Sequence, residues 1–303
     1  MQLSPITLFV YNRPEHTRIV LQSLADCQYA DQSVLYIFAD QAKNENAKEK
    51  VEQVRRIILE DIWKQKFLQV NVIEAAVNKG LANSVISGVT QVINKHGRII
   101  VVEDDNRVAP DFLDYMNRGL DFYCESRKIG YIGGYTVPIK IPQDYKKDVF
   151  LTGRGSSYAW ATWKDSWALV DWEGKDFEQF RKDKRAIASF NEYGEDRFEM
   201  LRHQVEGNMN SWAIRFSYAL WKNGKYAVLP CKTRVENIGF DGSGVHNVAE
   251  DKRFVNSIEK NLPKAQFEDL SEDIRIKKEF QRIFKVPFGI KLKRKIKHLL
   301  RRN

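Results

Sequence analysis

Cysteine is scarce in this sequence. Its 303 residues include only Cys27, Cys124 and Cys231, an odd number of residues spread far apart. Neither a disulfide framework nor a zinc site built from paired cysteines fits that spacing. We therefore expect a protein that works in a reducing compartment.

Long apolar runs are also missing. No stretch approaches the ~20 apolar residues that cross a bilayer, and the opening MQLSPITLFVYNRPEH has no basic segment followed by an apolar one. The sequence therefore predicts a cytoplasmic protein. Its hydrophobic content of 43% is enough for the core of one large domain, and no repeat or low-complexity linker divides it.

The net charge of +9 is concentrated at one end of the chain. The segment 288–303, FGIKLKRKIKHLLRRN, holds seven basic residues and no acidic one. On a helix its apolar residues would form one stripe, which is typical of a basic amphipathic helix lying on an anionic membrane surface. Aromatic residues do not interleave these charges, which argues against nucleic acid. We predict peripheral attachment to the inner face of the cell membrane; a solvated terminus that docks on the body is the alternative.

Continuously apolar strands alternate with helices through the first half of the sequence. The predicted strands span 6–11, 34–39, 68–73, 98–102 and 129–134. This pattern is typical of an α/β protein with a parallel sheet covered by helices on both faces. The second half is less regular, with aromatic turns, helices near 190–206 and 212–223, and a strand around 227–229.

Three consecutive carboxylates, Glu103-Asp104-Asp105, directly follow the fourth predicted strand. Ligands bind beyond the carboxyl ends of parallel strands. Adjacent carboxylates are costly to bury, but Mg²⁺ or Mn²⁺ needs only one or two of them when phosphates and water complete its coordination. The triplet therefore indicates a metal and diphosphate site. A solvated acidic turn that caps the next helix explains it equally well.

Other predicted strand ends carry groups suited to a nucleotide. Asn12 and Arg13 follow the first strand, Asp40 follows the second, and the turn Asn78 to Leu81 opens a helix, where backbone N–H groups favour anions. Each has an ordinary interpretation as a cap or turn. Their joint placement favours a nucleotide-binding edge.

Two later segments are candidates for contacts with a sugar. In GRGSSYAWATWKDSW (153–167), Tyr158, Trp160 and Trp163 would either stack on a sugar or belong to the core. The glycine-rich NIGFDGSGVH (237–246) is predicted to be a mobile lid that excludes water. Its His246 would touch the diphosphate or the metal, or is an ordinary surface histidine.

These segments resemble known sugar transferases. The run VVEDDNRVAPDFLDYM resembles the metal-binding segment of N-acetylglucosaminyltransferase I and its bacterial relatives, which are inverting enzymes of the GT-A fold. LFVYNRPEHTRIVLQSL, NKGLANSV, GRGSSYAWATW and NIGFDGSGVH are similar to bacterial family-2-like transferases. Together these matches cover most of residues 5–246, in the expected order.

The resemblance implies a GT-A (Rossmann-like) fold with a mostly parallel sheet flanked by helices, and a transferase that needs Mn²⁺ or Mg²⁺. Asp105 would bind the metal, with His246 as a second candidate ligand. The residues predicted to bind the nucleotide-sugar, a UDP-sugar such as UDP-N-acetylglucosamine, are Tyr11, Asn12, Arg13, Asp40, Asn78, Gly80, Leu81, Glu103, Asp104, Arg154 and Trp160.

We divide the chain into three parts. Residues 1–135 are predicted to be the nucleotide-sugar-binding half and 136–270 the irregular acceptor-binding half of the same GT-A domain. Residues 271–303 are predicted to be a basic amphipathic helical tail. The expected reaction is an inverting transfer to a glycan acceptor in bacterial surface polysaccharide synthesis. The basic tail predicts that this acceptor is lipid-linked.

One position departs from the family pattern. The family places its catalytic base, an aspartate, two residues before a tryptophan, and here GNMNSWAIRF puts Asn210 there. An amide does not accept a proton as a carboxylate does. Asn210 limits turnover, or Glu206 or Asp241 takes over as base, or the acceptor is activated differently.

Two other functions stay open. A sugar nucleotidyltransferase would need a glycine-rich basic loop after the first strand, and YNRPEH contains no glycine. A membrane-associated protein that binds a nucleotide-sugar with weak or no turnover is compatible with Asn210.

Overall fold

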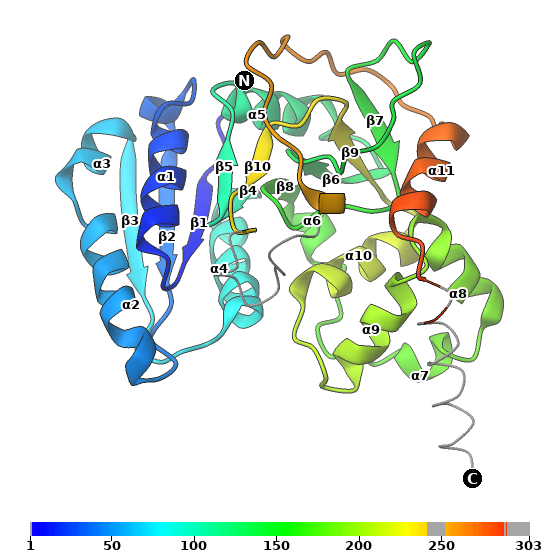
Figure 1. Cartoon of the computed structure of the whole chain (residues 1–303), viewed down its shortest axis with the longest axis horizontal. Helices are drawn as coiled ribbons and strands as arrows, with labels where there is room; N and C mark the ends of the chain where they lie inside the picture. Colours follow the sequence, from blue (N-terminus) through cyan, green and yellow to red (C-terminus); the bar gives the residue numbers. More distant parts are fainter. Residues whose placement is uncertain (1, 241–251, 288, 290–303) are drawn as a thin grey trace.

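The computed structural model describes residues 2–240, 252–287 and 289. Its centre is an eight-stranded sheet with helices on both sides (Figure 1). In spatial order the strands are β3 (Gln69–Glu74), β2 (Val34–Ala39), β1 (Ile6–Val10), β4 (Arg98–Glu103), β8 (Trp160–Trp163), β6 (Ile129–Gly133), β9 (Tyr226–Pro230) and β7 (Val149–Thr152). Six strands run in one direction, and β8 and β7 oppose them. The predicted α/β class with a mostly parallel sheet is confirmed.

The first four strands form a purely parallel unit. Its helices are α1 (Pro14–Ala25), α2 (Glu45–Ile58), α3 (Asp61–Lys66) and α4 (Leu81–His96). Pro14 is the first residue of α1, a position that needs no backbone N–H. In α4, Gly88 packs so closely that a Cβ atom there would lie 2.7 Å from the ring of Phe9. The helix therefore lies tight against β1 and β2.

An antiparallel strand, β8, joins this unit to the rest of the sheet. It pairs with β4 on one side and β6 on the other, so that Val101 and Gly133 both lie opposite Trp160. The sequence predicted aromatic turns here, which is wrong: β8 is followed directly by α6 (Lys164–Trp167). The four residues WATW form a strand because neighbours pair with them on both edges, which short-range sequence patterns do not reveal.

The second half adds a group of helices beside the sheet. They are α5 (Phe112–Phe122), α7 (Phe177–Phe180), α8 (Lys184–Phe190), α9 (Arg197–Val205), α10 (Trp212–Lys222) and α11 (Ile274–Ile283). Short 3-10 turns lie at Ala30–Gln32, Asn191–Tyr193 and Lys252–Phe254. The single helix predicted at 190–206 is divided, because Gly194 takes a φ of 151° that ends the helical path.

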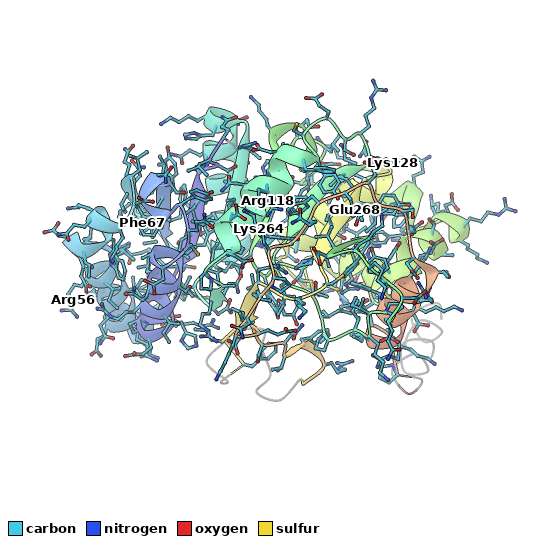
Figure 2. The ribbon with its side chains drawn as sticks, turned by 90° about the horizontal axis from the view of Figure 1, so that it is seen from above. Arg56, Phe67, Arg118, Lys128, Lys264 and Glu268 are labelled. Carbon is cyan, nitrogen blue, oxygen red and sulfur yellow. The ribbon has the colours of Figure 1, made fainter. Side chains whose placement is uncertain are left out.

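Two further features tie distant segments together. A small antiparallel ribbon pairs β5 (Asn106–Val108) with β10 (Val235–Asn237). The segment 255–273 runs back across α5. Lys264 Nζ lies 3.3 Å from Asp114 Oδ2, and the Tyr123 hydroxyl donates a hydrogen bond of 2.6 Å to the carbonyl of Glu268. Figure 2 shows Arg118 of α5 beside Lys264, with Glu268 further along the same segment.

One large hydrophobic core contains residues from both halves, from Ile6 in β1 to Ile283 in α11. A smaller cluster lies among α7 to α10. Of the tail predicted at 271–303, α11 is described and contributes Phe280 to the core, whereas 288 and 290–303 lie outside the described residues. Within the described part of the chain, no helix is both long and apolar enough to cross a membrane.

Candidate functional site

The parallel pairing gathers the predicted polar residues at one edge of the sheet. Val10 lies opposite Ala39, and Phe9 lies opposite Glu103, so β1, β2 and β4 end at nearly the same level. Arg13, Asp40 and the acidic triplet follow these ends directly. This edge is where open α/β sheets bind ligands.

Arg13 is the cation among the three acids of this edge. Its Nη1 lies 3.0 Å from Asp105 Oδ2 and 3.7 Å from Asp104 Oδ1. The backbone N–H of Tyr11 donates to Asp104 Oδ2 at 3.2 Å, and Asn106 donates to Asp105 Oδ1 at 2.6 Å. We call Arg13, Glu103, Asp104 and Asp105 the acid cluster.

The acid cluster carries more negative charge than Arg13 balances. Burial, and then repulsion from Asp105 and Asp104, raise the pKa of Glu103 well above its ordinary value. Burial and Asp105 raise the pKa of Asp104 to about 7, although Arg13 opposes the change. Glu103 Oε1 is buried and has no hydrogen-bond partner among the described residues. The cluster is therefore suited to receiving positive charge.

The second half reaches the acid cluster through Trp212. A hydrogen bond from its side chain to Glu103 counteracts part of the rise in the pKa of that carboxyl group. Trp212 is the first residue of α10 and is 4% exposed. The loop that contains Asn210 therefore lies close to the acids.

Asp40 holds a turn of the chain, a role that its sequence position did not indicate. Both of its oxygens accept hydrogen bonds from the chain: Oδ1 from the backbone N–H of Gln41 and Lys79, and Oδ2 from the N–H of Gly80 at 2.9 Å and the amide of Asn78 at 3.2 Å. Asp40 thus fixes the turn at 78–80. The two backbone N–H groups expected to attract an anion bind this carboxylate instead.

The remaining predicted nucleotide-binding residues lie along the same edge. Tyr11 accepts a hydrogen bond at its hydroxyl from the backbone N–H of Lys43, which joins the ends of β1 and β2. Asn12 is half-buried, and Leu81 is 47% exposed at the start of α4. The structure therefore brings these residues together around the acid cluster.

Trp160 is not available to a sugar. It is 0% exposed, and its ring stacks on Tyr131, Trp167 and Trp212, the last at 4.7 Å between centroids. The prediction that it binds the nucleotide-sugar is wrong, because β8 carries it between two strands into the core. Trp163 lies opposite Arg98, at the far end of β8 from the acid cluster.

Arg154 lies in the second half and pairs with Asp196 through two hydrogen bonds of 2.7 and 2.9 Å. It lines a cavity of about 240 Å³ with Tyr158, Ala213 and Ile214 among its other walls. We call this space the aromatic cavity. Its residues Ala213 and Ile214 directly follow Trp212, so the first turn of α10 contributes to the cavity and also reaches the acid cluster.

The candidate bases have partners of their own. Asn210 is exposed and accepts a hydrogen bond at Oδ1 from Arg215 at 3.0 Å. Glu206 pairs with Arg202 at 2.6 Å. Asp241 and His246 lie outside the described residues; the described start of their segment contacts the site, because the N–H of Ile238 donates to the carbonyl of Asp105 at 2.8 Å.

The described residues (2–240, 252–287 and 289) hold no group of three or more His, Cys, Asp or Glu side chains arranged around a metal. A protein cage for a metal is therefore not found in that part of the chain. The donor chemistry still fits one Mg²⁺ or Mn²⁺ bound mainly through phosphates. Such an ion needs only one or two carboxylates, and Glu103 Oε1 has no partner.

Sequence reasoning overlooked two residues. Asn106 directly follows the triplet, and besides Asp105 it holds the backbone N–H of Ala159 at 2.8 Å, which connects the acid cluster to the aromatic segment. Arg215 bonds Asn210, the carbonyl of Ser211 and the carbonyl of Trp172. Asn106 was visible as an amide beside the acids; nothing in the sequence indicated the role of Arg215.

Comparisons with known proteins identify no relative by sequence. No protein family matches this chain. No curated protein matches it either.

Similar chains are found among solved structures, among them the following two. S. aureus TarS has a TM-score of 0.45 and 14% identity over 77% of this chain and 36% of its own. UDP-glucose pyrophosphorylase complexed with UDP-glucose has a TM-score of 0.39 and 11% identity over 78% of this chain and 94% of its own. This chain therefore spans about a third of TarS. Likenesses of this size carry no argument about function.

Proposed function

We propose that this protein is a glycosyltransferase of the GT-A type that moves a sugar from a nucleotide-sugar, most simply a UDP-sugar, to a glycan acceptor. The observation that carries the proposal is the acid cluster at the carboxyl ends of two adjacent parallel strands. There Arg13 lies 3.0 Å from Asp105, and burial with mutual repulsion raises the pKa of Asp104 and Glu103. This is a site for a diphosphate accompanied by a cation.

A divalent cation, Mn²⁺ or Mg²⁺, would be held by Asp105, with His246 as the second candidate ligand. When bound, it would neutralise charge on the departing diphosphate. Arg13 positions the Asp104 and Asp105 carboxylates for this role. Tyr11, Asn12 and the turn that Asp40 fixes would border the base and the ribose.

The acceptor would approach from the side of α10. Inversion requires the acceptor hydroxyl to attack opposite the leaving diphosphate while a base takes its proton. Asn210 is not that base, because a neutral amide does not take a proton from a hydroxyl group as a carboxylate does. Its Oδ1 accepts a hydrogen bond from Arg215, and its NH2 group can donate to an acceptor. Asn210 is therefore suited to orienting an acceptor, and Glu206 or Asp241 remains the candidate for the proton.

The same residue favours a second candidate function. A protein with an intact nucleotide-sugar site and an amide at the base position would bind its donor and turn it over weakly or not at all. Comparison of the natural chain with Asn210→Asp separates the two functions. Arg215, already 3.0 Å from Asn210 Oδ1, would keep the new carboxylate ionised.

We propose that the tail at 288–303 holds the protein on the inner face of the cell membrane and that the acceptor is lipid-linked, in synthesis of a bacterial surface polysaccharide. The support is the sequence of the tail, with seven basic residues and one apolar stripe. Deletion of 288–303 is expected to move the protein from membrane to soluble fractions. An unchanged distribution would contradict this part of the proposal.

The central experiment is a thermal-shift series with UDP-sugars, with and without Mn²⁺. A ligand that binds the folded state raises its melting temperature, and we expect the rise to depend on Mn²⁺. Asp105→Asn should abolish the Mn²⁺-dependent part. Asp61→Asn is the matched control, since this side chain is 83% exposed and pairs only with Lys64 in α3.

Two results would contradict the central proposal. One is the absence of Mn²⁺-dependent stabilisation by any nucleotide-sugar, and the other is an equal response from Asp105→Asn and the natural chain. Turnover is measured separately as nucleotide release. If Asn210→Asp releases nucleotide and the natural chain does not, the binding function is the correct one for the natural chain.

A further inference from the structure

The described lining of the aromatic cavity contains two arginines and no acidic residue. It lies between residues 153–158, α9, the start of α10 and the end of α11, and its walls include the rings of Tyr135, Tyr158, Phe280 and Phe284. Two guanidinium groups, Arg154 and Arg197, belong to the lining found among the described residues, and no carboxylate does. The cavity therefore combines aromatic surface with positive charge.

Arg197 is a buried cation that has no carboxylate within 4 Å among the described residues. It is 1% exposed, donates to the carbonyl of Phe190 at 2.6 Å and to Ser217 Oγ at 2.8 Å, and stacks on the Phe190 ring. Its Nε has no hydrogen-bond partner. Burial, and then the charge of Arg154, lower the pKa of this guanidinium to about 9. A buried charge is costly unless an opposite charge accompanies it.

The nearest carboxylate is already engaged. Asp196 binds Arg154 through both oxygens, and the Arg154 guanidinium lies 3.5 Å from the centroid of the Phe284 ring. Two cations thus share one anion beside the cavity. The surplus is one positive charge next to aromatic rings, where an opposite charge interacts more strongly than in bulk water.

The start of α10 links the positively charged cavity to the acid cluster, the proposed donor site. Ala213 and Ile214 line the cavity, and the preceding Trp212 bonds Glu103 of the acid cluster. A ligand in the cavity would therefore lie next to the donor site. Its volume of about 240 Å³ suits one sugar ring, and flat aromatic walls suit the apolar face of such a ring.

We propose that the aromatic cavity binds a negatively charged sugar unit, one that carries a carboxylate, as the recognised unit of the acceptor. The role as acceptor rests on the proposed function; the binding of an acidic sugar does not. The carboxylate would lie beside Arg154 and Arg197, and the ring would lie against the tyrosines. A guanidinium favours carboxylates because it donates two parallel hydrogen bonds.

The test uses two variants that break the same ion pair but change the charge in opposite directions. Asp196→Asn removes the anion and leaves two cations, whereas Arg154→Gln leaves Asp196 to neutralise Arg197. The probes are methyl β-glucuronide and the neutral methyl β-glucoside, with affinities measured by calorimetry. We expect the natural chain to prefer the glucuronide by about tenfold, as one charge pair of about 1.4 kcal/mol implies.

Asp196→Asn should then tighten glucuronide binding and Arg154→Gln should weaken it, each by a factor of about three to ten. Equal affinity of the natural chain for the two sugars would overturn the proposal. The proposal would also be overturned if glucuronide affinity changed in the same direction in both variants. Loss of the Arg154–Asp196 ion pair, which both variants break, would then explain the change. Glucose 6-phosphate serves as a third probe: preference for it over the glucuronide would overturn the assignment of a carboxylate.

The same samples are titrated with a UDP-sugar and Mn²⁺. If the protein binds the glucuronide but not the UDP-sugar with Mn²⁺, the proposed function is contradicted and the acidic-sugar site stands. If it binds the UDP-sugar but not the glucuronide, only the acidic-sugar site is contradicted.

Discussion

The two halves of the molecule hold opposite surpluses of charge. At the end of the parallel unit, three carboxylates share Arg13, and Glu103 and Asp104 respond with raised pKa values. In the aromatic cavity, two guanidinium groups share Asp196. The first turn of α10 links them, because Trp212 bonds Glu103 and the next two residues line the cavity. A protein selected only for stability would balance each group locally, so the contrast indicates ligands of opposite charge on the two sides.

The largest effect is expected where the halves join. Trp160→Ala removes a fully buried ring that stacks on Trp212 and Trp167, and should lower the free energy of unfolding by about 3–5 kcal/mol. Urea unfolding followed by circular dichroism measures this. Trp163→Ala, half-buried at the other end of β8, should cost less. Two separate transitions in the natural chain would show that the halves unfold independently.

The next effect concerns the surplus of negative charge. Folding raises the pKa of Asp104 from 3.8 to about 7, so the folded state keeps a proton that the unfolded chain loses near pH 4. The contribution of Asp104 to stability therefore falls as the pH rises from about 4 to 7. The free energy of unfolding of Asp104→Asn, measured in EDTA, should equal that of the natural chain near pH 4. At pH 8 it should be larger by a few kcal/mol, because a change of one in the pKa corresponds to about 1.4 kcal/mol.

The control for that measurement is Asp61→Asn. This carboxylate is exposed, and its partner Lys64 lowers its pKa instead of raising it. Relative to the natural chain, Asp61→Asn should therefore be slightly less stable at pH 8 and equally stable at pH 3. If Asp104→Asn followed the same course, the charge surplus of the acid cluster would be refuted.

The smallest effect separates the two roles of Asp40. If it fixes the turn at 78–80, Asp40→Asn turns one acceptor oxygen into a donor facing backbone N–H groups. This should cost about 1–3 kcal/mol of stability. If it binds a ribose, as its sequence position suggested, stability should hardly change while nucleotide affinity falls. Thermal unfolding with and without nucleotide decides between them; Asn83→Asp, on the exposed first turn of α4, is the control.

The parallel unit could be predicted from the sequence because its information is local. Val34–Ala39 was found to the residue, and the other early strands lie within a residue or two of their predicted bounds. Each is a short apolar run between turn residues, and the acids follow a strand end directly. For the same reason Arg13 and the triplet were recognisable as parts of one site.

The second half could not be predicted in the same way. Trp160 was assigned to the sugar because an aromatic residue near glycines suits a binding loop, whereas pairing with β4 and β6 buries it. Asp40 was predicted to border the ribose because it follows a strand. Its role in holding the turn at 78–80 was not foreseen, because three of its donors lie almost forty positions away in the sequence. The hydrogen bond of Trp212 to Glu103 likewise depends on tertiary packing.

The ribbon of β5 and β10 has a consequence for how the protein is made. Asn106 pairs with Asn237, and the carbonyl of Asp105 binds the N–H of Ile238. During synthesis the four parallel strands emerge early and have their partners at hand. The backbone beside Asp105 gains its partner only after some 130 further residues have left the ribosome. The nascent chain therefore has its four parallel strands, half of the final sheet, long before it has a finished site.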